Sequence, residues 1–250
     1  MKRATAYRLG FIAAAVTALE VLCRAGVIKP LTMPAPSVIL GDLVVILGSG
    51  KMNGAMAKTL ANVAIAIVLS VSAGVVAGAA IHRWRALRDG LEPLFATYYA
   101  IPVYAFYPLF IVLFGLGDVP QILIGFMLAV VAVIVNTLNG LDRVPRVLAK
   151  TARIYRMGPA EAAFKVTLPY AAPYIFTGVK LAVAYAFIGV VGAEFIMSRT
   201  GLGYEINFAF NNFDNAVMYP LILLILAIAT ALNMSLHAWE IRLLRRRERG

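Results

Sequence analysis

Long apolar segments with few or no charges constrain this chain more than any other feature. The hydrocarbon core of a bilayer is about 30 Å thick, so a helix needs about 20 mainly apolar residues to cross it. Six segments of the sequence meet this requirement: 9–28, 59–82, 94–114, 119–141, 174–197 and 217–240. Hydrophobic residues make up 62% of the chain and charged residues 14%, which is outside the range of soluble domains. The sequence therefore predicts an all-α membrane protein with about six transmembrane helices.

The first of these segments is the least regular, because Glu20 and Arg24 lie inside it. Their spacing allows them to pair on one helix face near a membrane boundary. A basic start followed by an apolar run is also typical of a signal peptide. No small-residue cleavage pattern follows the apolar run, so we expect this segment to be retained as a helix.

The basic residues are concentrated in alternate loops. These loops precede the first segment, join the second to the third and the fourth to the fifth, and follow the sixth. With six spans they all lie on one side of the membrane. The positive-inside rule makes that side the cytoplasm and places both termini there. The formal net charge of +11 is thus explained by topology, and nucleic-acid binding is not needed to account for it.

The sequence offers no set of residues for catalysis, a cofactor or a metal. Cys23 is the only cysteine, which excludes an internal disulfide and a cysteine-cluster metal site. His82 and His237 lie near the cytoplasmic ends of different segments and lack metal-ligand spacing. No G-x-x-x-x-G-K-[ST] loop is present to hold nucleotide phosphates. We therefore expect a protein that is not an enzyme.

The polar stretches between the apolar segments are short. The longest are Lys29 to Lys58 and Leu141 to Pro173, and neither could form an attached soluble domain. We expect one transmembrane domain over 1–250, with a core at about 55–240 and a cytoplasmic loop at about 142–172.

Prolines and tyrosines distinguish the third apolar segment. Pro102 and Pro108 each free a backbone carbonyl, so a kinked helix is expected. Tyr99, Tyr104 and Tyr107 lie around these prolines. They either line a translocation pathway or are interfacial anchors or packed core residues, and the pattern favours neither.

Small residues recur every four positions in the second segment, at Ser70, Gly74 and Gly78. Such a stripe allows another helix to approach closely. Packing inside one chain is favoured over a dimer interface.

Glu194 is the one carboxylate deep within a strongly apolar segment. An acid at membrane depth is a functional candidate because it is costly to keep there. It could face the translocation pathway or bind a neighbouring helix through Asn136, Thr137 or Asn139, and the second alternative is favoured. Lys180, nearer the cytoplasmic end of the same segment, is expected to extend its amine to the membrane surface.

The passage between the fourth and fifth segments is basic and has helical periodicity. Residues from Arg146 to Met157 can form a short amphipathic helix. Gly158 can end it in the left-handed conformation, and Pro159 can begin a second helix because no N–H is needed there. Pro169 is expected to end the unit. Such a projection either inserts into a groove on a partner protein or lies on anionic lipid headgroups.

This passage resembles the cytoplasmic loop of permease subunits in ABC-type importers. The signature of that loop is Glu-Ala-Ala, three residues, Gly, and later Leu-Pro. Aligned on Gly158, the chain has Ala152 where the signature has its glutamate, and the interval from Gly158 to the Leu-Pro pair is shorter than usual. The resemblance implies a set of partner-docking residues: Thr151, Ala152, Arg153, Arg156, Gly158, Pro159, Leu168 and Pro169.

Other segments extend the resemblance to most of the chain. They are similar to the nitrate, sulfonate and taurine importer group, and comprise PAPSVIL at 34–40, AIPVYAFYPLFIVLFGLGD at 100–118, and FTGVKLAVAYAFIGVVGAEFI followed by GLGYEI. The resemblance implies a type I importer permease fold in the bacterial inner membrane. It also implies a homodimer of permeases, cytoplasmic ABC ATPases that hydrolyse the ATP, and an extracytoplasmic solute-binding protein.

The expected function is therefore that of the permease subunit of an ATP-driven importer, with Tyr99, Tyr104, Tyr107 and Glu194 as candidate pathway residues. The alternative is a secondary transporter or channel that needs no ATPase. Such a protein would have buried acids or paired charges in several segments, whereas only Glu194 stands out. The sequence does not distinguish nitrate, an alkanesulfonate, taurine, a thiamine-precursor pyrimidine or riboflavin as the solute.

Overall fold

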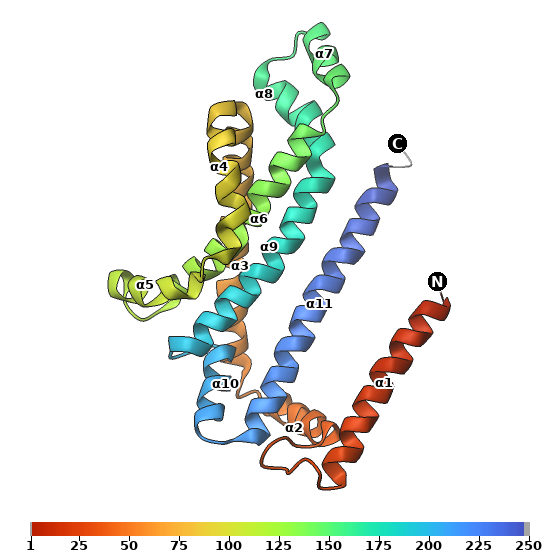
Figure 1. Cartoon of the computed structure of the whole chain (residues 1–250), viewed down its shortest axis with the longest axis vertical. Helices are drawn as coiled ribbons and strands as arrows, with labels where there is room; N and C mark the ends of the chain where they lie inside the picture. The colour runs from red at the N-terminus through yellow and green to blue at the C-terminus, as the bar shows by residue number, and fades with distance from the viewer. Residues whose placement is uncertain (1, 248–250) are drawn as a thin grey trace. The chain divides into compact units, whose positions relative to one another are not determined.

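A computed structural model describes residues 2–247 of the chain, and this range is helical with no strand (Figure 1). The elements in chain order are α1 Lys2–Arg24, α2 Pro36–Ser49, α3 Asn53–Arg83, α4 Arg85–Thr97, η1 Tyr98–Ala100, η2 Val103–Phe106, α5 Tyr107–Phe114, α6 Asp118–Asp142, α7 Arg146–Ile154, α8 Pro159–Ala162, η3 Ala163–Thr167, α9 Leu168–Met197, α10 Leu202–Asn211 and α11 Asn215–Arg247.

All six predicted segments are helical, and most are long and apolar enough to cross a membrane. By length and composition, four helices of the described chain qualify, or five if one bent pair counts as a span. The four are α3, α6, the stretch Pro159–Asn211 that contains α9, and α11. The helix α1 forms where the first segment was predicted but is not in this set, so its role as a span stays a prediction.

The third segment is not one helix, contrary to the expectation of a single kinked span. Its two parts, Ala86–Ala100 and Val103–Phe114, meet at an angle of 89°. Ile101 is extended, with φ −76° and ψ 125°, because the ring of Pro102 disfavours helical conformation in the preceding residue. Pro108 lies in the first turn of α5, where no backbone N–H is needed.

The chain separates into two compact units, one of Met1–Lys58 with Glu194–Ile228 and the other of Thr59–Ala193 with Ala229–Gly250. The expectation of one domain over 1–250 therefore stays a prediction. The first unit has its own apolar core, formed by Leu43, Leu202, Ile206, Leu221 and Leu224.

In the first unit, Glu20 joins α1 to the start of α2. Its carboxylate accepts hydrogen bonds from Arg24 Nε at 2.6 Å, from Ser37 N at 3.0 Å and from Ser37 Oγ at 2.6 Å. The predicted pairing of Glu20 with Arg24 is thus confirmed. Because Ser37 N–H is at the N-terminus of α2, the carboxylate also satisfies a donor that the helix leaves unpaired.

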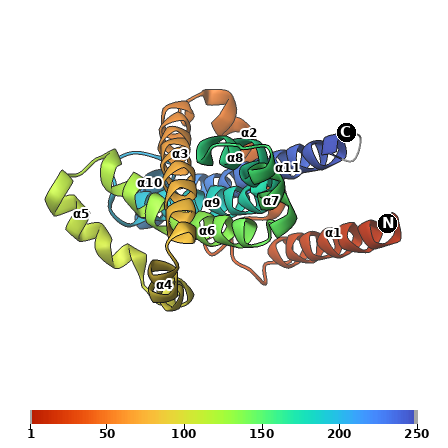
Figure 2. The ribbon, with the colours of Figure 1, turned by 90° about the horizontal axis from the view of Figure 1, so that it is seen from above.

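In the second unit, α3, α6 and α9 lie side by side (Figures 1 and 2) and pack through small residues. A Cβ added to Gly74 would lie 2.6 Å from Val133 Cβ, and one added to Gly78 would lie 2.8 Å from Thr137 Cβ. The small-residue stripe of α3 is therefore occupied by α6 of the same chain, as the favoured alternative predicted. In the contact between α6 and α9, a Cβ on Gly189 of α9 would lie 2.7 Å from Gly125 Cα of α6.

We predict that Gly189→Ala destabilises the protein, because its new Cβ meets backbone atoms that cannot rotate away. Overpacking of this kind costs about 1–3 kcal/mol. Gly90→Ala is the matched control, since a Cβ there meets nothing within 4 Å, and it should be neutral or stabilising by up to about 1 kcal/mol. Thermal unfolding of the detergent-purified protein, followed by size-exclusion chromatography, measures both. Equal melting temperatures would contradict the close approach of α6 and α9.

Candidate partner-docking projection and solute cavity

Residues 143–167, between α6 and α9, form the projection. Its first helix, α7, ends at Ile154 rather than at Met157 as predicted. The residue with a left-handed backbone is Arg156, at φ 51°, and not Gly158. Gly158 is extended, with φ −64° and ψ 160°, because Pro159 follows it and disfavours helical conformation there. The expectation that Gly158 closes the first helix is therefore wrong.

The second short helix, α8, begins at Pro159 as predicted. Glu161 lies in its first turn, where a negative charge is favoured by the helix dipole. The Lys165 amine donates to the Glu161 carboxylate at 2.7 Å, and this hydrogen bond holds the pKa of Glu161 below its usual value. Both groups are solvent-exposed, so the pair orders the side chains more than it stabilises the fold.

Pro169 does not end the helical unit, contrary to the prediction. The π-helical turn η3 continues α8 directly into α9, and Leu168 and Pro169 form the first turn of α9. The N–H of Leu168 bonds to Ala163 O, five residues back, and the next residue has no N–H to donate. The wider π-turn thus accommodates a proline that would interrupt a regular α-helix.

Two exposed stripes cover the outer surface of α7. One is mainly apolar and consists of Val147, Thr151 and Ile154; the other is cationic and consists of Arg146, Lys150 and Arg153. Residues three and four positions apart lie on one helix face, so the stripes run along neighbouring faces. Tyr155 and Phe164 add two exposed aromatic rings. Figure 1 shows α7 and α8 beyond the ends of α6 and α9.

The predicted docking residues differ in their accessibility. Ala152 is only 5% exposed and packs within the projection, so it is not available to a partner in this structure. Leu168 is half-buried. The others are exposed: Thr151, Arg153, Arg156, Gly158, Pro159 and Pro169.

The base of the projection contacts three other helices, α3, α4 and α9. Both terminal nitrogens of Arg88 on α4 donate to the two carboxylate oxygens of Asp142, the last residue of α6. His82 Nδ1 lies 3.1 Å from the same carboxylate. Arg143 lies over the ring of Tyr174 on α9, 5.0 Å from its centroid, and donates to its hydroxyl at 3.2 Å. The projection is therefore joined mechanically to α4 as well as to α6 and α9.

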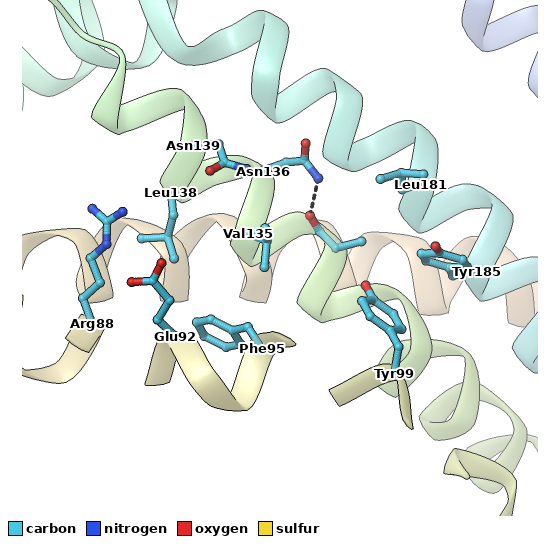
Figure 3. Close-up of a pocket in the computed structure, with 11 residues that line it drawn as sticks. Arg88, Glu92, Phe95, Tyr99, Val135, Asn136, Leu138, Asn139, Leu181 and Tyr185 are labelled. Atoms are coloured by element: carbon cyan, nitrogen blue, oxygen red, sulfur yellow. Dashed lines mark hydrogen bonds between the residues drawn. The ribbon is translucent and has the colours of Figure 1, made fainter. Parts of the chain in front are cut away.

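A cavity of about 460 Å³ lies between α4, η1, α6 and α9 (Figure 3). Its walls include Phe95, Val135 and Leu181. Six polar residues also line it: Arg88, Glu92, Tyr99, Asn136, Asn139 and Tyr185. A mainly apolar cavity with a few convergent polar groups is typical of a small-molecule site.

Only one of the predicted pathway tyrosines lines this cavity. The rings of Tyr99 and Tyr185 lie 5.6 Å apart at its edge. Tyr104 instead donates its hydroxyl to Ile188 O at 2.8 Å and packs against Gly192. Tyr107 is 1% exposed, within an apolar cluster with Val103, Ile124 and Ala193, so the packed-core alternative describes it.

Sequence reasoning missed Arg88, Glu92 and Tyr185 as lining residues. Arg88 lies in the basic loop that joins the second apolar segment to the third, where the sequence pattern indicates only topology. Glu92 and Tyr185 have no distinctive sequence context, and only the packing of three helices brings them together. Sequence reasoning also missed a long-range partner for Lys180, whose amine donates to both carboxylate oxygens of Glu240 at 2.8 Å.

Glu194 is fully buried in the first unit and lies against the start of α10. Its Oε2 accepts a hydrogen bond from Gly203 N–H at 3.0 Å. Gly201, at φ 104°, passes so close that an added Cβ would lie 2.2 Å from the Glu194 Cδ. This backbone donor is not one of the side chains that the sequence led us to expect, which were those of Asn136, Thr137 and Asn139. The arrangement supports a structural role in which the carboxyl group satisfies the N-terminus of a helix.

These features define a multi-pass helical membrane protein of the transport class. The family model for the binding-protein-dependent transport system inner membrane component matches residues 70–249, and the chain belongs to this family. It is therefore the membrane permease subunit of an ABC importer. Members of this family are not themselves enzymes, and they work with ATPase and binding-protein partners in the inner membrane. The resemblance inferred from the sequence is confirmed.

Several relatives are transport permeases. The chain is 27% identical to the taurine transport system permease protein TauC of Escherichia coli (strain K12), over 97% of this chain and 90% of the relative. It is 28% identical to the nitrate import permease protein NrtB of Leptolyngbya laminosa, over 74% and 68% of the two chains. It is 33% identical to the bicarbonate transport system permease protein CmpB of Synechococcus elongatus, over 57% and 50%.

We predict that Glu194→Ala destabilises the protein by about 1–3 kcal/mol, because it leaves the buried Gly203 N–H without its acceptor. Glu194→Gln keeps an acceptor oxygen and should lose less. Thermal unfolding of both variants tests this order. Unchanged stability with lost transport would instead favour a pathway role for the carboxyl group.

Proposed function

We propose that this permease forms the pathway for a small polar solute that a binding protein delivers from outside the cytoplasm. Two copies form the membrane channel, both termini lie in the cytoplasm, and separate ATPase subunits hydrolyse the ATP. The concentration of cations in alternate loops supports this orientation. The solutes in the names of the relatives, taurine, nitrate and bicarbonate, are all small and polar, which supports the solute class.

The exposed surface of the projection carries this proposal. Val147, Ile154, Tyr155 and Phe164 remain exposed on a segment that also carries cations. Apolar and aromatic residues exposed together are costly in water and are typical of a protein-binding surface. Docking of an ATPase would bury them, whereas the cationic stripe would contact acidic groups at the rim of the same interface.

The connections of the projection suggest how docking could be coupled to transport. The projection is continuous with α9 through η3, and it follows α6 after only three residues. Asn136 of α6 and Tyr185 of α9 both line the cavity. A displacement of the projection by the ATPase would therefore move two walls of the cavity, and Arg88 would carry the movement to the third. Two global states with different partner affinities are sufficient for alternating access.

Phe164 is one of the two exposed aromatic residues of the projection. Phe164→Ala should weaken association with the ATPase about tenfold, since truncating a buried aromatic anchor commonly costs more than about 1 kcal/mol. Trp84→Ala is the matched control, because Trp84 is 62% exposed and Phe164 is 73% exposed, but Trp84 lies outside the projection. Copurification of the ATPase with each tagged variant measures the difference. Equal loss in both would contradict docking at this surface.

The conformation and surroundings of Gly158 allow a side chain to be added there. Its φ of −64° suits any residue, and an added Cβ would meet no atom within 4 Å. Gly158→Ile should therefore leave the permease fold intact but reduce copurified ATPase, because the bulk stands in the proposed interface. Gly90→Ile, also free of contacts within 4 Å, controls for the added side chain. Normal association with the ATPase and normal transport by Gly158→Ile would contradict docking at this surface.

A further inference from the structure

The cavity between α4, α6 and α9 contains polar groups that the protein itself does not satisfy. Within the part of the chain that the structure describes, the hydroxyls of Tyr99 and Tyr185 and the amide of Asn139 form no hydrogen bond. Asn136 uses only its amine, which donates to Ala132 O at 2.8 Å (Figure 3). Polar groups inside a membrane protein require water or a solute as partner, so these groups are available to a ligand.

The charges at one end of this cavity are unequal in number. Arg88 is its only cation among the lining residues described, and both of its terminal nitrogens are already bound to Asp142. The carboxylates of Asp89 and Glu92 also attract this guanidinium. Around the Arg88 guanidinium, one permanent positive charge thus meets three carboxylates, and His82 adds a second positive charge only when it is protonated. Of the three carboxylates, only that of Glu92 lines the cavity. The excess is negative.

Glu92 brings this negative charge to the cavity wall. It lies between Arg88 and Phe95 in the lining, on the same side of the cavity (Figure 3). The rings of Phe95, Tyr99 and Tyr185 line the same space. A carboxylate beside aromatic faces is a favourable environment for an ammonium group. An inorganic anion would find the one guanidinium engaged and would be repelled by Glu92.

The volume of the cavity also favours an organic solute over an inorganic anion. A cavity of about 460 Å³ is within the range of sites for small organic molecules. An anion of four atoms would leave most of it to water, whereas a short organic chain could reach from Glu92 to the amides and hydroxyls.

We propose that this cavity binds, on its way to the cytoplasm, a small organic solute that carries a cationic amine, and that Glu92 recognises the amine. The amides of Asn136 and Asn139 and the two tyrosine hydroxyls bind the polar remainder of the solute. The proposal rests on the proposed function, since it names the solute class of the same importer. Of the solutes named for the relatives, taurine fits this class, whereas nitrate and bicarbonate do not.

The test compares two probes that differ only in the amine, taurine and ethanesulfonate. The permease, copurified with its ATPase and without any binding protein, is placed in lipid nanodiscs. Saturation-transfer difference NMR then detects weak binding of each probe through its methylene protons. We expect about fivefold stronger binding of taurine, the upper range for a partly exposed charge pair. Excess nitrate should not displace it.

Variants test whether the carboxylate of Glu92 is responsible for the preference for taurine over ethanesulfonate. Glu92→Gln should reduce the preference for taurine to about onefold to twofold, because only the charge is removed. Glu92→Asp keeps the charge and should keep a preference. Asp42→Asn, in α2, removes a carboxylate outside the cavity and should leave the preference unchanged.

Equal binding of the two probes by the unmodified protein, absence of binding by both, or an unchanged preference in Glu92→Gln would overturn the proposal. The unmodified protein alone supplies two of these outcomes, so the test does not depend on the folding of a variant. Loss of the ATPase during purification would contradict the proposed function instead. The same NMR comparison could still be made on the permease by itself, so the two failures are distinguishable.

Discussion

Direct contact between the backbones of α6 and α9 is the constraint on which the second unit depends. Gly189 and Gly125 meet so closely that neither could carry a side chain without displacing the other helix. Glycine has no apolar side chain of the kind that would hold helices together in water. Between helices in lipid, however, it allows close approach and extensive van der Waals contact. This contact fixes the spacing at which Asn136 and Tyr185 face one cavity. Looser packing would separate the lining residues that three different helices supply.

Proline determines the shape of the functional segments because it disfavours helical conformation in the residue before it. Pro159 makes Gly158 extended and so sets the corner of the projection, and Pro102 makes Ile101 extended and so divides the third apolar segment. In contrast, Pro169 follows a π-turn and interrupts nothing. The local rule is the same in each case, but the backbone around the proline decides whether a helix ends. The continuity from α8 into α9 is what makes the projection suitable for transmitting movement.

The ionic groups near the predicted cytoplasmic side serve two purposes at once. In the sequence, Arg88 belongs to one of the basic loops that predict the orientation, and Lys180 lies near the predicted cytoplasmic end of its segment. In the structure, each is paired: Arg88 with Asp142 at the base of the projection, and Lys180 with Glu240 on α11. The orientation of the chain is predicted from the number of cations in each loop alone. A connection between helices depends instead on the residue to which each cation is bound. The number of cations in each loop therefore predicts an orientation but says nothing about which helices the charges connect.

The sequence by itself determined the helical segments, the family and the position of the projection, because long apolar runs, alternate basic loops and proline corners are local properties. It could not determine that Tyr107 is packed, that Tyr99 lines a cavity, or that Glu194 binds Gly203. Those outcomes depend on contacts between residues far apart in the chain. Only the tertiary structure decided these contacts, because the partner of a polar side chain depends on which helix packs against its face. Which helices pack together depends in turn on close approach at glycines.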